Sequence, residues 1–292
     1  MISNYEKQYI KICENILLNG YYSNNRTGIP TYKLPHQIMQ IDLEKEFPIL
    51  KSKFVAFKTA VKELLWIMQG NNNVKYLQKQ NCHVWDKWMM EDGTIGTAYG
   101  WVIKNFDLVN KLIDKLKNDN QDRAMMINLY QYDYIDGGSL RPCVFNSMWD
   151  VTDGKLNCML VQRSGDMPLG VPFNTTQYAV LVHILAEICN LKVGQLTHVI
   201  NNAHIYENQI EGIKQQIYNY NKLNFYNELS KFTGKEVEEE CKDFKYIISS
   251  NPKLKLNIEG KDFSEITYKD IELEGYSINE GNMGKIEMPV SV

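Results

Sequence analysis

A cysteine and an arginine that could act together lie twenty residues apart in the chain. Cys143 directly follows Pro142, and Arg163 follows Gln162 in the stretch QRSGD at 162–166. The thiolate is the nucleophilic form of cysteine, and a positive charge nearby lowers the pKa of the thiol. A cysteine at the start of a strand is more often a small core residue, so its type alone leaves both interpretations open.

The segments around these two residues indicate that they lie close in space. Residues 144–151 (VFNSMWDV) and 156–162 (LNCMLVQ) have the composition of strands, and DGK at 153–155 is typical of a turn. A hairpin of these strands would place Cys143 and Arg163 at neighbouring ends. The predicted hairpin therefore favours a thiol beside a guanidinium group.

Glu63 lies inside a strongly apolar segment, 55–69, whose spacing predicts a helix that ends at Gly70. The residue falls at the edge of the predicted buried stripe. Glutamates at such an edge usually point to solvent, and spacing alone favours this interpretation. A carboxylate in a dry site would instead have a raised pKa and could transfer protons.

Polar side chains crowd the stretch after the second predicted strand. Arg163 is followed by Ser164 and Asp166, and GVPFN at 170–174 ends in Asn174. The amide of Asn174 could match one donor and one neighbouring acceptor of a planar ring. The same residue types dominate ordinary turns, so the support for a binding site comes from their crowding.

Aromatic residues and a histidine add further candidates. Trp85 and Trp88 (VWDKW) and Tyr99 (TAYG) lie in a polar stretch, where a flat ligand could stack on them. Most such rings are packing residues. His204 and Tyr206 are predicted to open an amphipathic helix, as a cap and a core anchor.

Arginine is rare in this chain, which makes each one a candidate for specific binding. Of the 32 lysine and arginine residues, four are arginine: Arg26, Arg123, Arg141 and Arg163. The planar guanidinium group binds phosphate or carboxylate through two parallel hydrogen bonds, which lysine cannot do. A lone arginine can also be a surface residue in a weak ion pair.

Composition argues against several classes of function. The net charge is −3, so no basic field indicates nucleic acid binding. No run approaches the roughly 18 apolar residues of a membrane span, and the N-terminus is not a secretory signal. The six cysteines and five histidines are scattered without metal-binding spacing, which predicts reduced thiols in the cytoplasm and no metal site.

Helices and strands are mixed along the chain, and no repeat or linker divides it. Helices are expected at 5–19, 55–69, 107–117, 177–190 and 204–220. Strands are expected at 32–42, 124–130, 144–151, 156–162 and 195–201, with strand-like pieces after 251. Because no βαβ rhythm is present, the elements predict one α+β domain over residues 1–292.

In order along the chain, the motifs resemble those of the folate-dependent thymidylate synthase family. They are NRTG (25–28), KELLW (62–66), VWDKW (84–88), AYG (98–100), RPC (141–143), QRSGDMPLGVPFN (162–174), AHIY (203–206) and the terminal PVSV. The resemblance implies one domain around a mixed β-sheet and a homodimer packed sheet to sheet. It also implies a reaction of dUMP with the co-substrate 5,10-methylenetetrahydrofolate to give dTMP and dihydrofolate, without a metal.

The resemblance further implies roles for individual residues. Cys143 would attack carbon 6 of uracil, while Glu63 and Tyr99 would handle protons and Asn174 would recognise the uracil edge. The dUMP-binding residues would be Arg26, the partner subunit's Arg123, Gln162, Arg163, Ser164, Asp166, Asn174, His204 and Tyr206. The folate-binding residues would be Trp85, Trp88, Asp166, Gly170, Phe173 and the terminal carboxylate of Val292.

Three departures from the family pattern stand out. Val144 follows the cysteine where many members have histidine, and Ala124 replaces the second arginine of a pair, for which Arg141 could compensate. Asn201-Asn202 replaces Gly-Asp. The lost carboxylate keeps an alternative open, a dUMP hydroxymethylase on the same scaffold, in which water rather than hydride ends the reaction.

Other features favour the synthase over this alternative. Asn174, Trp85 and the terminal PVSV are all present, and a tryptophan there could shield the intermediate from water. A third hypothesis is a catalytically dead relative that only binds nucleotide or RNA. The negative net charge and the intact Cys143 and Glu63 argue against it.

Overall fold

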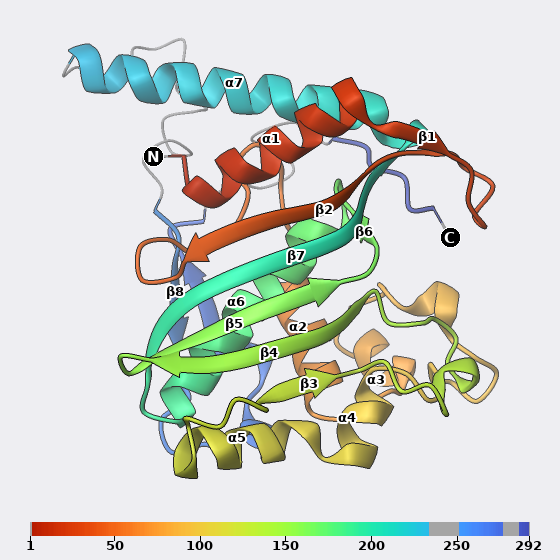
Figure 1. Cartoon of the computed structure of the whole chain (residues 1–292), viewed down its shortest axis with the longest axis vertical. Coiled ribbons are helices and arrows are strands. Elements are labelled where there is room, and N and C mark those ends of the chain that lie inside the picture. Colours follow the sequence, from red (N-terminus) through yellow and green to blue (C-terminus); the bar gives the residue numbers. More distant parts are fainter. Residues whose placement is uncertain (1, 234–250, 277–285, 292) are drawn as a thin grey trace.

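The computed structural model describes residues 2–233, 251–276 and 286–291, and a mixed β-sheet forms its centre (Figure 1). The seven-stranded sheet has the order β1-β2-β7-β5-β4-β3, and β6 pairs with β7. β7 runs parallel to β5 and β6, and the other pairs are antiparallel. Its strands are β1 (Tyr21–Ser23), β2 (Thr31–Asp42), β3 (Met126–Asn128), β4 (Val144–Thr152), β5 (Lys155–Gln162), β6 (Gly165–Asp166) and β7 (Lys192–Tyr206).

Helices pack behind the sheet and along its two edges, so the predicted α+β class is confirmed. In Figure 1, α2 and α6 lie behind the sheet, α1 and α7 lie beyond β2, and α5 lies beside β3. A small second sheet pairs β8 (Lys253–Leu256) with β9 (Ile271–Glu274). The α-helices are α1 (Asn4–Asn19), α2 (Phe57–Met68), α3 (Val74–Gln78), α4 (Gly100–Phe106), α5 (Leu108–Asn118), α6 (Gly170–Ile188) and α7 (Ile210–Thr233).

The β4–β5 hairpin forms as predicted. Asp153 and Gly154 both have positive φ (52° and 69°), which suits a tight two-residue turn between antiparallel strands. The register then pairs Val144 with Gln162, after one irregularity near Asn146. The residues directly before β4 and after β5, Cys143 and Arg163, are therefore neighbours.

α6 begins seven residues earlier than predicted. Gly170 and Pro172 suggest a loop, but the first turn of a helix tolerates proline because its N–H groups have no partner within the helix. Burial on nearly all sides of the helix stabilises the rest. Asn174 is therefore a helical residue rather than the end of a loop.

The prediction that His204 and Tyr206 open a helix is wrong. β7 continues through both residues, since it pairs with β2 from Thr31↔Tyr206 to Asp42↔Gln195. The helical segment starts only after Tyr206, with a short 3-10 turn before α7. Long-range pairing with β2 thus overrides the local helical pattern.

One broad face of the sheet is not covered by helices within the described residues, as Figure 1 shows. Cross-strand pairing aligns Met126, Met148, Met159 and Thr197 in one row across it. The three methionines are 36–47% exposed, and Ile38 in the neighbouring row is 53% exposed. The opposite face of the sheet packs into one extensive hydrophobic core that reaches from Tyr5 to Ile271.

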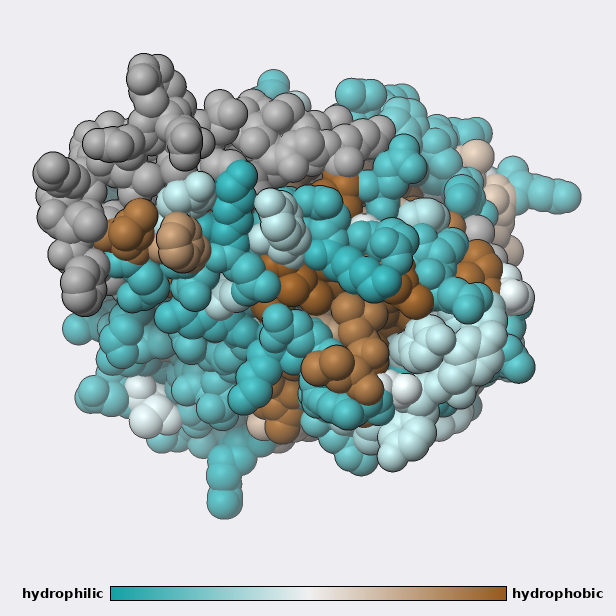
Figure 2. Space-filling view, turned by 90° about the horizontal axis from the view of Figure 1, so that it is seen from above, coloured by the Kyte–Doolittle hydropathy of each residue, from teal (hydrophilic) through white to brown (hydrophobic). Residues whose placement is uncertain are grey.

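The view from above, over α1 and α7, shows a mostly hydrophilic surface with hydrophobic residues near its middle (Figure 2). None of the helices in the described ranges combines the length and the hydrophobicity that crossing a membrane requires.

Candidate active site

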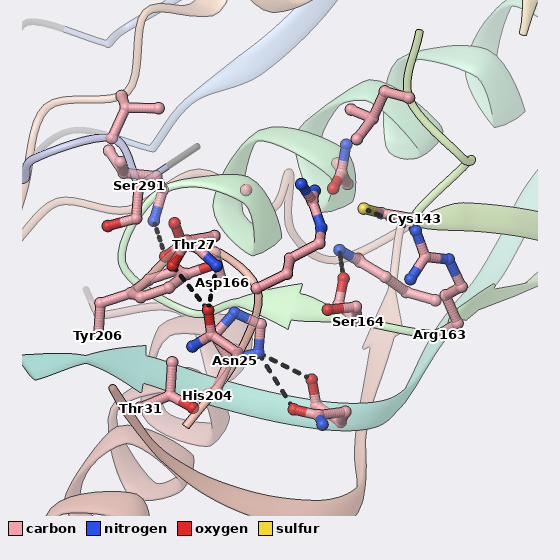
Figure 3. Close-up of a pocket in the computed structure, with 18 of the residues that line it drawn as sticks. Asn25, Thr27, Thr31, Cys143, Arg163, Ser164, Asp166, His204, Tyr206 and Ser291 are labelled. Carbon is pink, nitrogen blue, oxygen red and sulfur yellow. Dashed lines mark hydrogen bonds between the residues drawn. The ribbon is translucent and has the colours of Figure 1, made fainter. Parts of the chain in front are cut away.

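A cavity of about 600 Å³ opens at the edge of the sheet where β4 begins and where β5 and β7 end. Figure 3 shows Cys143, Arg163 and Ser164 at one end of it and Asp166, His204 and Tyr206 toward the other. Its walls include most residues that the sequence singled out, namely Arg26, Glu63, Trp85, Trp88, Tyr99, Cys143, Gln162, Arg163, Ser164, Asp166, Gly170, Phe173, Asn174, His204 and Tyr206.

Arg163, just after β5, is anchored across the hairpin end to the backbone of the segment just before β4. Its N–H donates to the carbonyl of Cys143 (2.9 Å), its Nε donates to Pro142 O (2.9 Å), and its Nη2 donates to Arg141 O (2.8 Å). The same Nη2 lies 3.8 Å from the Cys143 sulfur. The guanidinium group is therefore held beside the thiol by bonds that do not depend on a ligand.

Two opposing effects act on the Cys143 thiol. Burial raises its pKa, whereas the positive charges of Arg163 and then Arg26 lower it. Formation of the thiolate therefore depends on these two guanidinium groups. Cys13 and Cys158, in contrast, are fully buried, and burial raises the pKa of each.

Tyr99 lies directly against Cys143. Its hydroxyl accepts a hydrogen bond from the Cys143 backbone N–H (3.1 Å), and the side chain is buried. Tyr99 has φ 47° and ψ −103° at the start of α4, a strained conformation for a residue with a side chain. Burial raises the pKa of the phenol well above its usual value, so the hydroxyl is neutral and can accept or donate a proton.

Glu63 does not point to bulk solvent, which was the interpretation that spacing alone favoured. Its Oε1 accepts from the Trp85 indole N–H (2.6 Å), and its Oε2 accepts from Gln177 Nε2 (2.8 Å). Burial raises the pKa of the carboxyl, and the two hydrogen bonds lower it. A half-buried carboxylate with a raised pKa is suited to proton transfer.

Arg26 reaches the cavity from a turn that its neighbours stabilise. Asn25 Oδ1 accepts from the backbone N–H (2.9 Å) and the hydroxyl (2.6 Å) of Thr27, and Asn25 Nδ2 donates to Ile29 O (2.7 Å). Gly28 has φ 76°, which glycine adopts readily. Arg163 and Ser164 reach the same end of the cavity from the end of β5. This end therefore combines the guanidinium groups of Arg26 and Arg163 with the hydroxyl of Ser164.

A buried chain of hydrogen bonds supports this end of the cavity. Gln162 Nε2 donates to Ser164 O (2.9 Å), which leaves Gln162 Oε1 to accept from His198 Nε2 (2.8 Å). His198 Nδ1 lies 3.0 Å from the Thr175 hydroxyl. Burial lowers the pKa of His198 to about 3, so this histidine is neutral and structural.

Asp166 and the C-terminal segment meet at the other end. Asp166 Oδ1 accepts from the Leu169 N–H (3.2 Å) and Oδ2 accepts from Gln209 Nε2 (3.2 Å). Gln209 also donates to Pro289 O (3.0 Å), which brings Ser291 to the cavity wall. Burial raises the pKa of Asp166 to about 6.

His204 and Tyr206 line the cavity from the end of β7. His204 Nδ1 lies 3.1 Å from Asn202 Oδ1 and 3.3 Å from Asn202 O. Burial lowers the pKa of His204 to about 4, so the ring is neutral. Asn202, which departs from the family pattern, thus orients a histidine and also lines the cavity.

Aromatic rings form one wall. Trp85 stacks edge-on against Trp88 (centroids 5.6 Å apart) and Tyr99 (5.2 Å), and its far side packs on the buried Trp66 (5.7 Å). With Phe173, they provide flat apolar surfaces on which a planar ring can stack.

Two predicted site residues are not part of this cavity. Arg123 is exposed in the turn before β3, next to Ala124, and Val292 lies outside the described residues. Arg141 forms an exposed ion pair with Asp136 (2.7 Å), and both line a smaller pocket beside the cavity. Within the described ranges, no group of three or more His, Cys, Asp or Glu could hold a metal ion.

Sequence reasoning missed Gln177, which contacts both Glu63 and Asn174. The sequence signal that could have indicated Gln177 is its spacing from Asn174, since residues three positions apart lie on the same face of a helix. That signal was hidden because the helix was predicted to begin at 177. Thr31 and Lys33 of β2 were also missed, and no motif marks them.

The chain is similar to known proteins in both sequence and structure. The family model for thymidylate synthase matches residues 7–292. The chain is 58% identical, over the full length of both proteins, to a thymidylate synthase of Clostridium beijerinckii. Its structure is similar to that of the thermostable thymidylate synthase A from Bacillus subtilis, with a TM-score of 0.78, 32% identity and 99% of each chain covered. The chain therefore belongs to the thymidylate synthase family.

Proposed function

We propose that this protein converts dUMP into dTMP by reductive methylation, with 5,10-methylenetetrahydrofolate as co-substrate. The observation that carries the proposal is the Cys143 sulfur 3.8 Å from Arg163, in a cavity that also contains Glu63 and Asn174. A nucleophile, a fixed cation, a carboxylate and an amide that can pair with a ring are the groups that this reaction requires. Membership of the family supports the same conclusion.

In the proposed reaction, the Cys143 thiolate bonds to carbon 6 of the uracil ring. The electron pair of the C5–C6 double bond shifts toward the ring oxygen, where fixed donors stabilise the charge, and carbon 5 becomes nucleophilic. Glu63 moves protons at the ring oxygen through water, and Tyr99 receives the proton that leaves carbon 5. When bound, the folate supplies the one-carbon unit and the hydride. Expulsion of the thiolate then releases dTMP.

The remaining residues bind and orient the substrates. Arg26, Arg163, Ser164 and the partner subunit's Arg123 hold the 5′-phosphate, because paired guanidinium groups match phosphate oxygens. His204 and Tyr206 bind the sugar hydroxyl. Gln162 supports the phosphate loop and Asn174 pairs with the uracil edge. The folate lies against a wall formed by Trp85, Trp88, Asp166, Gly170, Phe173 and the Val292 carboxylate.

A homodimer packed sheet to sheet belongs to this proposal. The uncovered face carries the row of Met126, Met148, Met159 and Thr197, and a second copy would bury it. A two-fold interface of this kind also allows the exposed Arg123 to reach the partner's cavity. We place the protein in the cytoplasm, as one catalytic domain over residues 1–292 that binds no nucleic acid or membrane.

The test is incubation with dUMP and the folate, following dihydrofolate absorbance and the mass of the product. Formation of dihydrofolate together with dTMP supports the proposal. A hydroxymethylated product without dihydrofolate would indicate the hydroxymethylase instead, and no turnover would contradict both. The control is Cys143→Ser, which should bind dUMP but form no product.

A further inference from the structure

The side chain of Gln177 connects two residues to which the proposed function gives separate roles. On one side, Gln177 Nε2 donates to Glu63 Oε2 (2.8 Å) and to the Ala60 carbonyl (3.2 Å). On the other side, Gln177 Oε1 accepts from Asn174 Nδ2 (3.1 Å). Gln177 is 4% exposed, while Glu63 and Asn174 are half-buried, so the Gln177 end of each contact is shielded from water.

The neighbours of Gln177 determine which way its amide points. Glu63 Oε2 and Ala60 O are both acceptors, and the backbone carbonyl stays an acceptor at every pH. A reversed Gln177 amide would place Oε1 against two acceptors in a buried site, which is unfavourable. The amide oxygen of Gln177 must therefore face Asn174.

This orientation in turn fixes the amide of Asn174. The Asn174 nitrogen must point to Gln177 Oε1, since a reversed Asn174 would place its own oxygen against the buried oxygen of Gln177. Its Oδ1 lies instead on the side of Gly170, 3.8 Å from the position that a Cβ of that glycine would take. Asn174 thus presents to the cavity an acceptor, Oδ1, and the second N–H of its amide.

We propose that Gln177 is a specificity-determining positioning residue that makes the site select uracil over cytosine. This inference rests on the proposed function, in which Asn174 pairs with the base. Uracil offers a donor at N3 and an acceptor at O4, which match the fixed Oδ1 and N–H of Asn174. Cytosine offers an acceptor at N3 and a donor at N4, so it requires the reversed amide.

The size of the preference for uracil follows from the hydrogen bond that a reversal of the Asn174 amide would break. Binding cytosine would exchange the Asn174–Gln177 bond for two facing oxygens in a buried site. Leaving a buried polar group unpaired reduces an equilibrium constant by about tenfold or more. Within the described residues, Gln177 is the one side chain hydrogen-bonded to the Asn174 amide. The neighbouring Val144 has no polar group that could take its place. Removing the Gln177 side chain should therefore weaken the preference of the site for uracil over cytosine.

The experiment compares dUMP and dCMP dissociation constants, by calorimetry, for the native protein, Gln177→Met and Gln177→Leu. Each replacement fills the space without a hydrogen-bonding group, and two variants are used in case one does not fold. We expect the ratio of the dCMP to the dUMP dissociation constant to fall at least about tenfold in each folded variant. The matched control is Gln216→Met, another buried helical glutamine, which contacts Ser52 (3.2 Å) away from the base-pairing amide.

The outcomes separate this inference from the proposed function. The inference is supported if the ratio of the dCMP to the dUMP dissociation constant is lower in the Gln177 variants than in the native protein and is unchanged in Gln216→Met. An unchanged ratio in a folded Gln177 variant that still binds dUMP would overturn the inference and leave the proposed function intact. A native protein that binds neither nucleotide would contradict the proposed function, and the inference with it.

Discussion

Replacing Arg163 by glutamine removes the positive charge nearest to the Cys143 sulfur. The Nη2 and Sγ atoms lie 3.8 Å apart. Two unit charges at that separation attract by about 1 kcal/mol in water and by about 4 kcal/mol at an effective dielectric constant of about 20. Because Cys143 is half-buried, the loss should fall between these limits. At a pH below the thiol pKa, the thiolate should become about 6-fold to about 1000-fold rarer in Arg163→Gln.

The assay is the rate of alkylation of Cys143 by iodoacetamide, a neutral reagent, followed by mass spectrometry of the peptide that contains this residue. Cys13, Cys82 and Cys158 are buried and should react slowly, whereas Cys189 is half-buried like Cys143, so the specificity of the measurement comes from the Cys143 peptide. The pH dependence of the rate reports the thiol pKa directly. We expect Arg163→Gln to shift that dependence to higher pH.

The matched control is Arg163→Lys, which keeps the charge but loses the two hydrogen bonds to the carbonyls of Pro142 and Arg141. If charge is the cause, alkylation should slow much less in Arg163→Lys than in Arg163→Gln. Equal slowing in both variants would show that the backbone anchor, not the charge, sets the reactivity. An unchanged rate in both would refute the reasoning altogether.

Three further predictions concern carboxyl groups whose pKa burial raises. The folded-state pKa of Asp166, about 6, exceeds its unfolded value, so its contribution to stability is present at low pH and is lost as the pH rises. Between pH of about 4 and about 7, the free energy of unfolding of the native protein should therefore fall relative to that of Asp166→Asn by up to about 3 kcal/mol. The measurement is urea unfolding at a series of pH values, and the same pH dependence in both proteins would contradict the prediction. Trp85→Phe removes a donor to Glu63, so the acid limb of kcat/KM for dTMP formation should move to higher pH, and an unmoved limb would argue against Glu63 as the titrating group. Glu6→Ala removes the carboxylate oxygen that accepts hydrogen bonds from two buried backbone N–H groups, so it should lower the free energy of unfolding by about 2–5 kcal/mol. Glu14→Ala on the same helix should change it by less than about 1 kcal/mol.

Local sequence signals predicted the parts of the site that depend on local structure. The β4–β5 hairpin follows from its turn residues, and it alone places Cys143 beside Arg163. The end of β7 could not be predicted in this way, because His204 belongs to a strand through pairing with β2, more than 160 residues away in sequence. Periodicity reports which face of a segment is apolar, but it does not report which distant strand will pair with it.

Besides long-range strand pairing, the sequence did not reveal the orientation of individual side chains. Spacing placed Glu63 at the edge of a buried stripe, where solvent is the usual neighbour. The structure turns it inward because Trp85 and Gln177 each donate to one of its oxygens. Both donors come from other elements, so no pattern within α2 indicates them.

The topology explains why residues so far apart in sequence meet at one edge of the sheet. β5 and β7 are parallel, so both end at this edge, and the antiparallel β4 begins there. The connection from β5 to β7 runs through α6, whose N-terminus therefore lies at the same edge and brings Asn174 with it. A helix N-terminus and the adjoining strand ends favour anionic ligands, since free N–H groups and the positive end of the helix dipole point there. One parallel crossover in an otherwise antiparallel sheet thus brings Cys143, Arg163 and Asn174 together, although local patterns gave no sign of a βαβ unit.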